Sequence, residues 1–210
     1  MRNDKLKATT PVSYLRNWIT TTLLASILLF TLSGCGYNSF QRLDEETKSS
    51  WSEVVNQYQR RSDLIPNLVA TVKGYAQHEE KVLTEVTDAR AKATSINVNP
   101  ELLDNPEKFA KYQEAQGALQ ASLGRLLAVA ENYPQLKADA AFRDLQVQLE
   151  GTENRITVAR GNYIRAVKEY NVLVRSFPSV MTATIFGYKI KPVFTVENEA
   201  AVASAPNVQF

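Results

Sequence analysis

The sequence predicts an all-α fold, an elongated antiparallel three-helix bundle with a short C-terminal helix and an extended tail. Two observations carry this prediction. Apolar residues recur at alternating steps of three and four along three long segments, and prolines mark the breaks between them. A repeat of about 3.5 residues makes one apolar seam on a helix, and such a seam must be buried against partner helices. Short connections between the segments favour antiparallel neighbours over a parallel coiled coil.

The first helix is expected to begin near Asn38 and to end before Asn97–Pro100, because a proline disfavours the helical conformation of the residue before it. A helix of about 60 residues would be roughly 90 Å long, so we expect a rod. Interior Pro66 lacks a backbone donor and would kink this helix. The seam consists of Trp51, Val54, Tyr58, Arg61, Ile65, Leu68, Val72, Tyr75, Glu79, Val82, Val86, Ala89, Ala93 and Ile96.

The second helix is signalled by Asn105, which can cap it, and by Pro106, which suits a first helical turn. It is expected to end at Pro134, and the third helix is expected to end at Phe177-Pro178. Tyrosines on the seams are interpreted as core residues rather than as a stack for a ligand. The two seams consist of Phe109, Tyr112, Gln116, Leu119, Leu123, Leu126, Ala130 and Tyr133, and of Phe142, Leu145, Leu149, Thr152, Ile156, Ala159, Tyr163, Ala166, Tyr170, Leu173 and Phe177.

After the third helix the pattern changes. Residues 180–186 predict a short apolar helix that ends at Gly187. Residues 188–196 alternate as an extended strip, which we expect to pack back on the bundle; the alternatives are that it lies on lipid or pairs with another chain. Residues 197–210 have no periodicity and are expected to be a disordered tail.

The N-terminal segment predicts attachment to a membrane. A basic stretch is followed by the uncharged residues 18–32, and Ser33 and Gly34 then precede Cys35, the only cysteine of the chain. This order is that of a bacterial lipoprotein signal, with Leu32–Cys35 as the lipobox. We therefore predict that residues 1–34 are a signal peptide and that Cys35 becomes a diacylated N-terminus. Residues 35–196 would then form a bundle in the cell envelope, on the periplasmic side.

An uncleaved anchor is the alternative. Residues 17–41 carry no charge, and a membrane-spanning helix needs about 20 predominantly apolar residues. The chain would then be a single-pass membrane protein. In both cases the rest of the chain is held at a membrane surface, and the choice between inner and outer membrane stays open.

Charge and composition exclude several classes of function. Residues 1–34 hold four of the 24 basic and one of the 22 acidic residues, so the remainder has 20 basic and 21 acidic residues and a net charge of −1. No strong field exists to attract nucleic acid. One cysteine allows no intrachain disulfide. A zinc site needs about four ligands, and His78 is the only histidine, so we expect neither a metal site nor a cofactor.

Arg61 is the one cation on a predicted seam. A buried guanidinium must be paired and hydrogen-bonded, and the candidate carboxylates are those of Asp63, Glu150 and Glu153. We interpret the surrounding cluster as a polar lock that fixes the register of the helices around the proline. The alternative is a small polar notch that binds a ligand or a partner. The cluster consists of Arg60, Arg61, Asp63, Pro66 and Asn67.

Residues 60–75, RRSDLIPNLVATVKGY, resemble the signature of the LemA family. The resemblance continues through residues 76–79 and 88–91, and it returns at residues 170–178 and 185–188. It implies an elongated helical bundle attached to a bacterial membrane near its N-terminus, and it implies no enzymatic activity. The lipobox is a departure, because many members have a plain N-terminal membrane segment.

These observations together predict a membrane-anchored, non-enzymatic envelope protein. We expect a scaffold or adaptor whose rod presents a helical surface to partner proteins of unknown identity. One alternative is a regulatory accessory of a membrane protease or transporter, and another is a small-ligand binder at residues 60–67. A homo-oligomer is compatible with the sequence.

Overall fold

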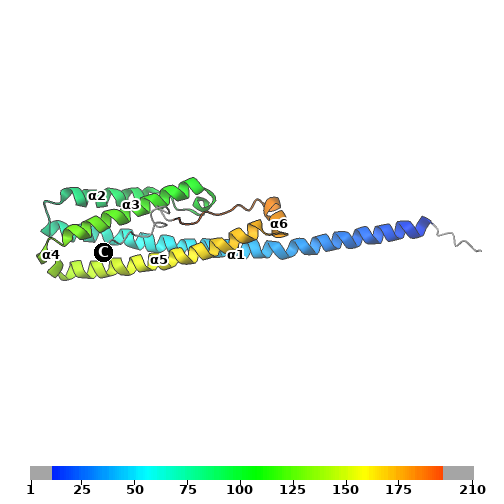
Figure 1. Ribbon diagram of the computed structural model, residues 1–210, viewed down its shortest axis with the longest axis horizontal. Coiled ribbons are helices and arrows are strands. Elements are labelled where there is room, and N and C mark those ends of the chain that lie inside the picture. Colours follow the sequence, from blue (N-terminus) through cyan, green and yellow to red (C-terminus); the bar gives the residue numbers. More distant parts are fainter. Residues whose placement is uncertain (1–10, 196–210) are drawn as a thin grey trace, which may run out of the picture.

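The computed structural model describes the backbone of residues 11–195 and the side chains of residues 16–24 and 36–195. Figure 1 shows an elongated body in which α1 lies along α5 and α2 lies along α3, while α1 continues beyond the bundle as a single helix. The predicted all-α bundle is confirmed. The elements are α1 (Pro11–Tyr75), α2 (Glu80–Ser95), the 3-10 helix η1 (Pro100–Asp104), α3 (Pro106–Ala130), α4 (Pro134–Ala138), α5 (Ala140–Arg175) and α6 (Ser179–Phe186).

The prediction for the first helix is wrong at both ends. The helix begins at Pro11 rather than near Asn38, and it ends at Tyr75, after which residues 76–79 connect it to α2. The described part of the chain therefore has four long helices, because the expected first helix is divided in two. The seam repeats in phase across the connection, so its periodicity does not reveal the break. α1 continues through Pro66 as one helix.

Two side-chain caps fix where helices begin. Asn105 accepts a hydrogen bond from the backbone N–H of Lys108 at 3.0 Å and so caps α3, as its position predicts. Asp139 accepts from the N–H of Phe142 at 2.9 Å and caps α5. The hydroxyl of Tyr75 donates to the other oxygen of Asp139 at 2.9 Å, which joins the end of α1 to the start of α5.

The core is divided into three clusters along the rod, and the middle cluster is the most aromatic. Trp51 lies there among the rings of Phe109, Tyr163 and Phe194, with centroid distances of 5.4–6.1 Å from Trp51. Three of the four side chains come from the predicted seams. Phe194 comes from the extended strip, so the middle of the core includes a residue from the C-terminal end of the described chain.

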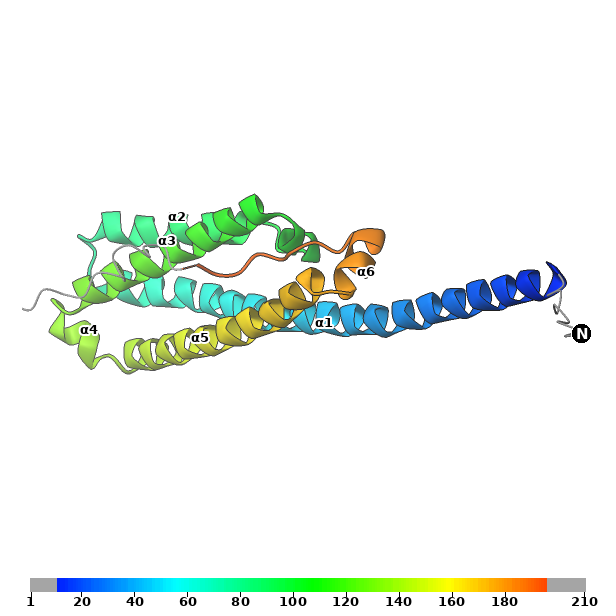
Figure 2. The same cartoon turned by 45° about the vertical axis from the view of Figure 1, so that its right-hand side comes forward.

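The extended strip packs on the bundle, as predicted. The hydroxyl of Tyr163 donates to the backbone carbonyl of Pro192 at 2.9 Å. The side chain of Asn171 makes two hydrogen bonds of 2.8 Å with the backbone of Lys191, one to its carbonyl and one from its N–H. Lys191 is buried, and its ammonium lies 2.7 Å from Asp44 of α1. Figure 2 shows the strip returning from α6 along the bundle.

Three predictions fall wholly or partly outside the described residues: the start of the signal peptide in residues 1–10, the side chain of Cys35, and the tail at 197–210. Among the described residues, no helix has both the length and the hydropathy that a membrane span requires.

Candidate functional site

Arg61 joins three helices at the centre of the bundle. Its side chain is only 1% exposed. One terminal nitrogen donates to Glu153 Oε1 of α5 at 3.0 Å. The other donates to Gln116 of α3, to the side-chain oxygen at 2.6 Å and to the backbone carbonyl at 3.3 Å. The guanidinium carbon also lies 5.0 Å from the centre of the Tyr58 ring. These contacts link α1, α3 and α5.

Among the described residues, Arg61 contacts one carboxylate, that of Glu153. Burial raises the pKa of Tyr58, although the charges of Arg160 and Arg61 act in the opposite direction. The Tyr58 hydroxyl therefore stays neutral at neutral pH, and Glu153 is the anion in contact with Arg61. Arg61 Nε is buried and has no hydrogen-bond partner among the described residues.

The rest of the predicted cluster does not gather around Arg61. In a helix, residues three and four apart share a face, so residues 60, 63 and 67 lie on the side opposite the seam. Asp63 accepts a hydrogen bond from Gln59 at 2.8 Å, on its own helix, rather than pairing with Arg61. Four members of the cluster are exposed, namely Arg60, Asp63, Pro66 and Asn67.

The backbone carbonyl that Pro66 leaves without an intrahelical donor has a donor on another helix, which the sequence did not indicate. A proline in a helix has no N–H to donate to the carbonyl four residues before it, which here is that of Ser62. Ser62 is buried, and Arg90 Nε of α2 donates to this carbonyl at 2.8 Å. Because a helical proline leaves one carbonyl without a donor, the sequence could have indicated the Ser62 carbonyl as a free acceptor. No feature of the sequence near Pro66 indicates that Arg90 is its donor.

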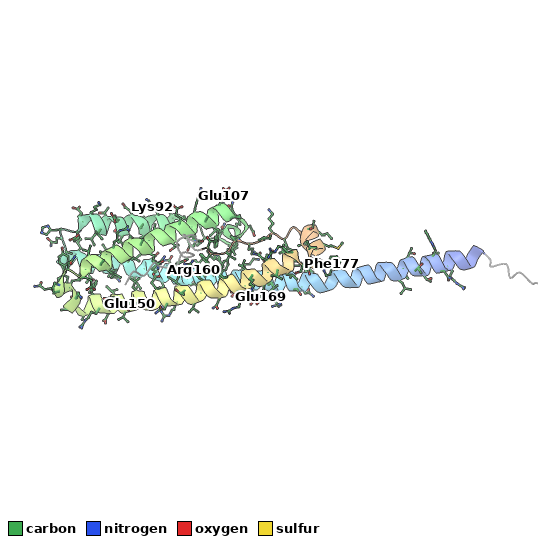
Figure 3. The ribbon with its side chains drawn as sticks, in the orientation of Figure 1. Lys92, Glu107, Glu150, Arg160, Glu169 and Phe177 are labelled. Carbon is green, nitrogen blue, oxygen red and sulfur yellow. The ribbon has the colours of Figure 1, made fainter. Side chains whose placement is uncertain are left out.

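A cleft of about 410 Å³ opens beside Arg61. Arg160 lies on its wall, and Figure 3 labels this residue on α5. The Arg160 guanidinium carbon is 4.4 Å from the centre of the Phe194 ring. Gln113, also on the wall, donates to the backbone carbonyl of Thr195 at 2.6 Å and thereby holds the end of the strip. The remaining lining residues are Tyr58, Gln116, Gly117, Gln120, Ala121 and Ile156.

A second buried ion pair holds the strip to α1. Lys191 Nζ lies 2.7 Å from Asp44 and 4.0 Å from Asp104, and 5.1 Å from the centre of the Tyr170 ring. Burial raises the pKa of Asp44, but hydrogen bonds to Lys191 and Lys48 lower it by more, so the net pKa is below the ordinary value. The sequence predicted that the strip would pack on the bundle but did not assign Lys191 a partner.

His78 is exposed, in the connection between α1 and α2. No group of three or more metal-ligating side chains occurs in the part of the chain whose side chains the structure describes.

These features define a class of protein, an elongated helical bundle whose long N-terminal helix extends beyond the bundle and whose helices are joined by buried arginine contacts. The family model of the LemA family matches residues 50–210, and the chain belongs to the LemA family.

Magnetosome proteins are among the curated relatives of the chain. It is 26% identical over 169 residues to magnetosome proteins MamQ 1 and MamQ 2 of Paramagnetospirillum magneticum, covering 73% of this chain and 62% of each relative. It is 24% identical over 183 residues to magnetosome protein MamQ of Magnetospirillum gryphiswaldense, covering 80% of this chain and 67% of that protein. The chain thus spans about two thirds or less of the length of these relatives.

Proposed function

We propose that this chain is a membrane-anchored, non-enzymatic envelope protein that presents a helical surface to partner proteins. The observation that carries the proposal is the free part of α1, which extends beyond the bundle in Figures 1 and 2. Four large apolar side chains on it are between 60% and 78% exposed. Large apolar side chains exposed on a helix outside the bundle are typical of a segment that enters lipid or packs on another protein. The four are Trp18, Ile19, Leu23 and Leu24.

The proposed anchor is the lipid on Cys35. Removal of residues 1–34 would take away the exposed apolar segment and leave two acyl chains, which together suffice for stable attachment. The bundle would then stand directly on the periplasmic face of a membrane, because Phe40, five residues further along α1, is already buried in the core. If the signal is not cleaved, the same segment of α1 enters the membrane.

The proposed surface for partners lies on the outer side of α5. Val147, Val158 and Val172 are exposed, and their separations of 11 and 14 residues correspond to about three and four helical turns. The three side chains therefore lie in one row along the rod. Single exposed apolar residues are common on soluble proteins, so the proposal rests on the alignment of these three side chains, roughly 16 and 21 Å apart along one side of α5.

A photo-reactive residue at position 158 or 172 tests this proposal in living cells. We expect both positions to cross-link to the same envelope protein, identified by mass spectrometry, while Lys92 on α2 gives no such adduct. Equal labelling at the three positions, or none, contradicts the proposal. An adduct between two copies of this chain would instead indicate self-assembly, and an adduct with a membrane protease or transporter would indicate a regulatory accessory.

A second candidate function is the binding of a small anion in the cleft beside Arg61. Arg160 has no carboxylate partner among the described residues, and the amides of Gln113, Gln116 and Gln120 lie on the same wall. Guanidinium groups with amide donors suit phosphate or carboxylate groups. Inorganic phosphate should raise the melting temperature of the wild type but not of Arg160→Gln. Exposed Arg155→Gln is the control, and an equal shift in all three proteins contradicts this candidate.

A further inference from the structure

We propose that α6 forms a membrane-contact surface that lies in the lipid interface beside the anchor. This inference rests on the proposed attachment of the chain through Cys35 or the helix that contains it. It adds that a segment about 150 residues further along the chain also touches the bilayer. Three features support it, namely the position of α6, its exposed apolar side chains and the charges that border it.

The first feature is position. Figures 1 and 2 both show α6 beside α1 at the point where α1 leaves the bundle. A Cβ built on Gly36 would lie 3.4 Å from Thr182 Oγ1 of α6. The rings of Tyr37 and Phe186 are 5.1 Å apart. Gly36 directly follows Cys35, so both a lipidated Cys35 and an uncleaved spanning helix would place α6 at the membrane surface.

The second feature is the exposed face of α6. Ala183 is the one buried residue of this helix, and it packs with Phe40, Tyr170 and Val174 in the third core cluster. The large apolar side chains of α6 and of the residue before it are exposed instead, although Phe186 also contacts Tyr37. Phe177, which precedes α6 and is labelled in Figure 3, is 82% exposed, and Ile185 is 76% exposed. Val180, Met181 and Phe186 are exposed as well.

The third feature is the distribution of charge. No charged residue occurs between Arg175 and Lys189, and both ends of this uncharged segment are basic. An apolar segment with basic flanks is typical of a helix that lies in the interface, where the cations meet anionic headgroups. A water-exposed loop of this length without any charge would leave the apolar side chains uncovered.

The bundle also holds α6 rigidly in this orientation. The rings of Phe40 and Tyr188 stack at 4.5 Å, and Gln41 donates to the Tyr188 hydroxyl at 2.7 Å. Gly187 ends α6 with a φ of 73°, a conformation that favours glycine, and the strip then runs back along the bundle. The membrane contact would therefore fix the tilt of the rod relative to the bilayer, which a flexible lipid anchor alone cannot do.

Fluorescence quenching by spin-labelled lipid tests the surface. Ile185→Cys and, as a control, exposed Lys92→Cys on α2 are labelled with bimane in the full-length protein from its native cell, reconstituted in vesicles that contain phosphatidylglycerol and doxyl phospholipid. The protein without an added cysteine is labelled in the same way. Any fluorescence that it shows comes from bimane on Cys35 and is subtracted. We expect severalfold stronger quenching at position 185 than at position 92, and loss of the difference when Met181→Asp and Phe186→Asp are added.

Equal quenching at both positions in protein that sediments with the vesicles overturns this inference and leaves the proposed attachment standing. Protein that does not sediment with the vesicles overturns both. A bimane at position 185 that is shielded in native membranes but unquenched by lipid also overturns the inference, because a protein partner then covers α6.

Discussion

Arg90 of α2 donates a hydrogen bond of 2.8 Å to the backbone carbonyl of Ser62 in α1, the acceptor that Pro66 leaves without an intrahelical partner. A buried unsatisfied carbonyl is destabilising by about 1–3 kcal/mol, so the defect in one helix becomes a fixed point of contact with the next. The proline and the arginine lie 24 residues apart and act as a pair.

We expect Arg90→Ala to lower the free energy of unfolding by about 1–3 kcal/mol, because the Ser62 carbonyl loses its donor. In a Pro66→Ala background the same substitution should be nearly neutral, since residue 66 then has an N–H for that carbonyl. Chemical denaturation of the four proteins of this double-mutant cycle measures the coupling. Exposed Arg155→Ala on α5 controls for loss of an arginine from the surface. An equal cost of Arg90→Ala in both backgrounds would show that the two residues are independent.

Glu153→Ala should destabilise the protein by about 1.5–3 kcal/mol, because it removes a charged hydrogen bond and leaves the buried Arg61 cation without an anion. Arg61→Met combined with Gln116→Leu and Glu153→Leu should be close to neutral, because the buried polar group and both of its side-chain partners are then replaced together and no buried acceptor loses its donor. Thermal or denaturant unfolding measures both. A polar lock predicts these losses with α-helical circular dichroism retained, whereas a stability unchanged by Glu153→Ala argues for a binding notch.

The Asp44–Lys191 contact predicts a dependence of stability on acid pH. The native pKa of Asp44 lies below its ordinary value, so its contribution to stability is present above about pH 4, the unfolded value, and is lost as pH falls through the native pKa. The difference in unfolding free energy between wild type and Asp44→Asn should therefore be constant near neutral pH and shrink below pH 4. A difference that does not change with pH would mean that the ion pair does not form.

Phe194→Ala should cost about 3 kcal/mol, since a large ring is removed from the middle core cluster. It should also shift the emission of Trp51, whose ring centre is 6.1 Å from that of Phe194. Phe177→Ala, at an exposed position, should change neither. Fluorescence-monitored denaturation measures both quantities, and a stability equal to that of the wild type would show that the strip does not belong to the folded core.

The sequence predicted those elements whose boundaries have local causes. Asn105 and Pro106 begin α3, and Gly187 ends α6, because caps, prolines and left-handed glycines act within one turn. The break after Tyr75 was missed because the connection contains neither glycine nor proline and the seam stays in phase across it. Gly74, one residue before the end of α1, was the available signal.

The candidate site was predictable only in part. A cation on a seam predicts burial, and Arg61 is indeed buried. Of its three candidate carboxylates, Glu153 is the one that it contacts. Its contact with Gln116, and that of Arg90 with Ser62, depend on how separate helices cross. The periodicity of one helix does not show which residues of another helix it meets. The predicted cluster was therefore made of neighbours in sequence, and it includes Asp63, which faces solvent.

The attachment of the chain to a membrane is the central claim, and it is tested most directly by the intact mass and membrane partition of the protein from its native cell beside a Cys35→Ser form. We expect the wild type to have lost residues 1–34, to have gained the mass of lipid and to sediment with membranes, while the variant keeps its N-terminus. A wild-type protein that keeps residues 1–34 but still sediments would show a spanning helix in place of the lipid. A wild-type protein found free of membranes would contradict the account.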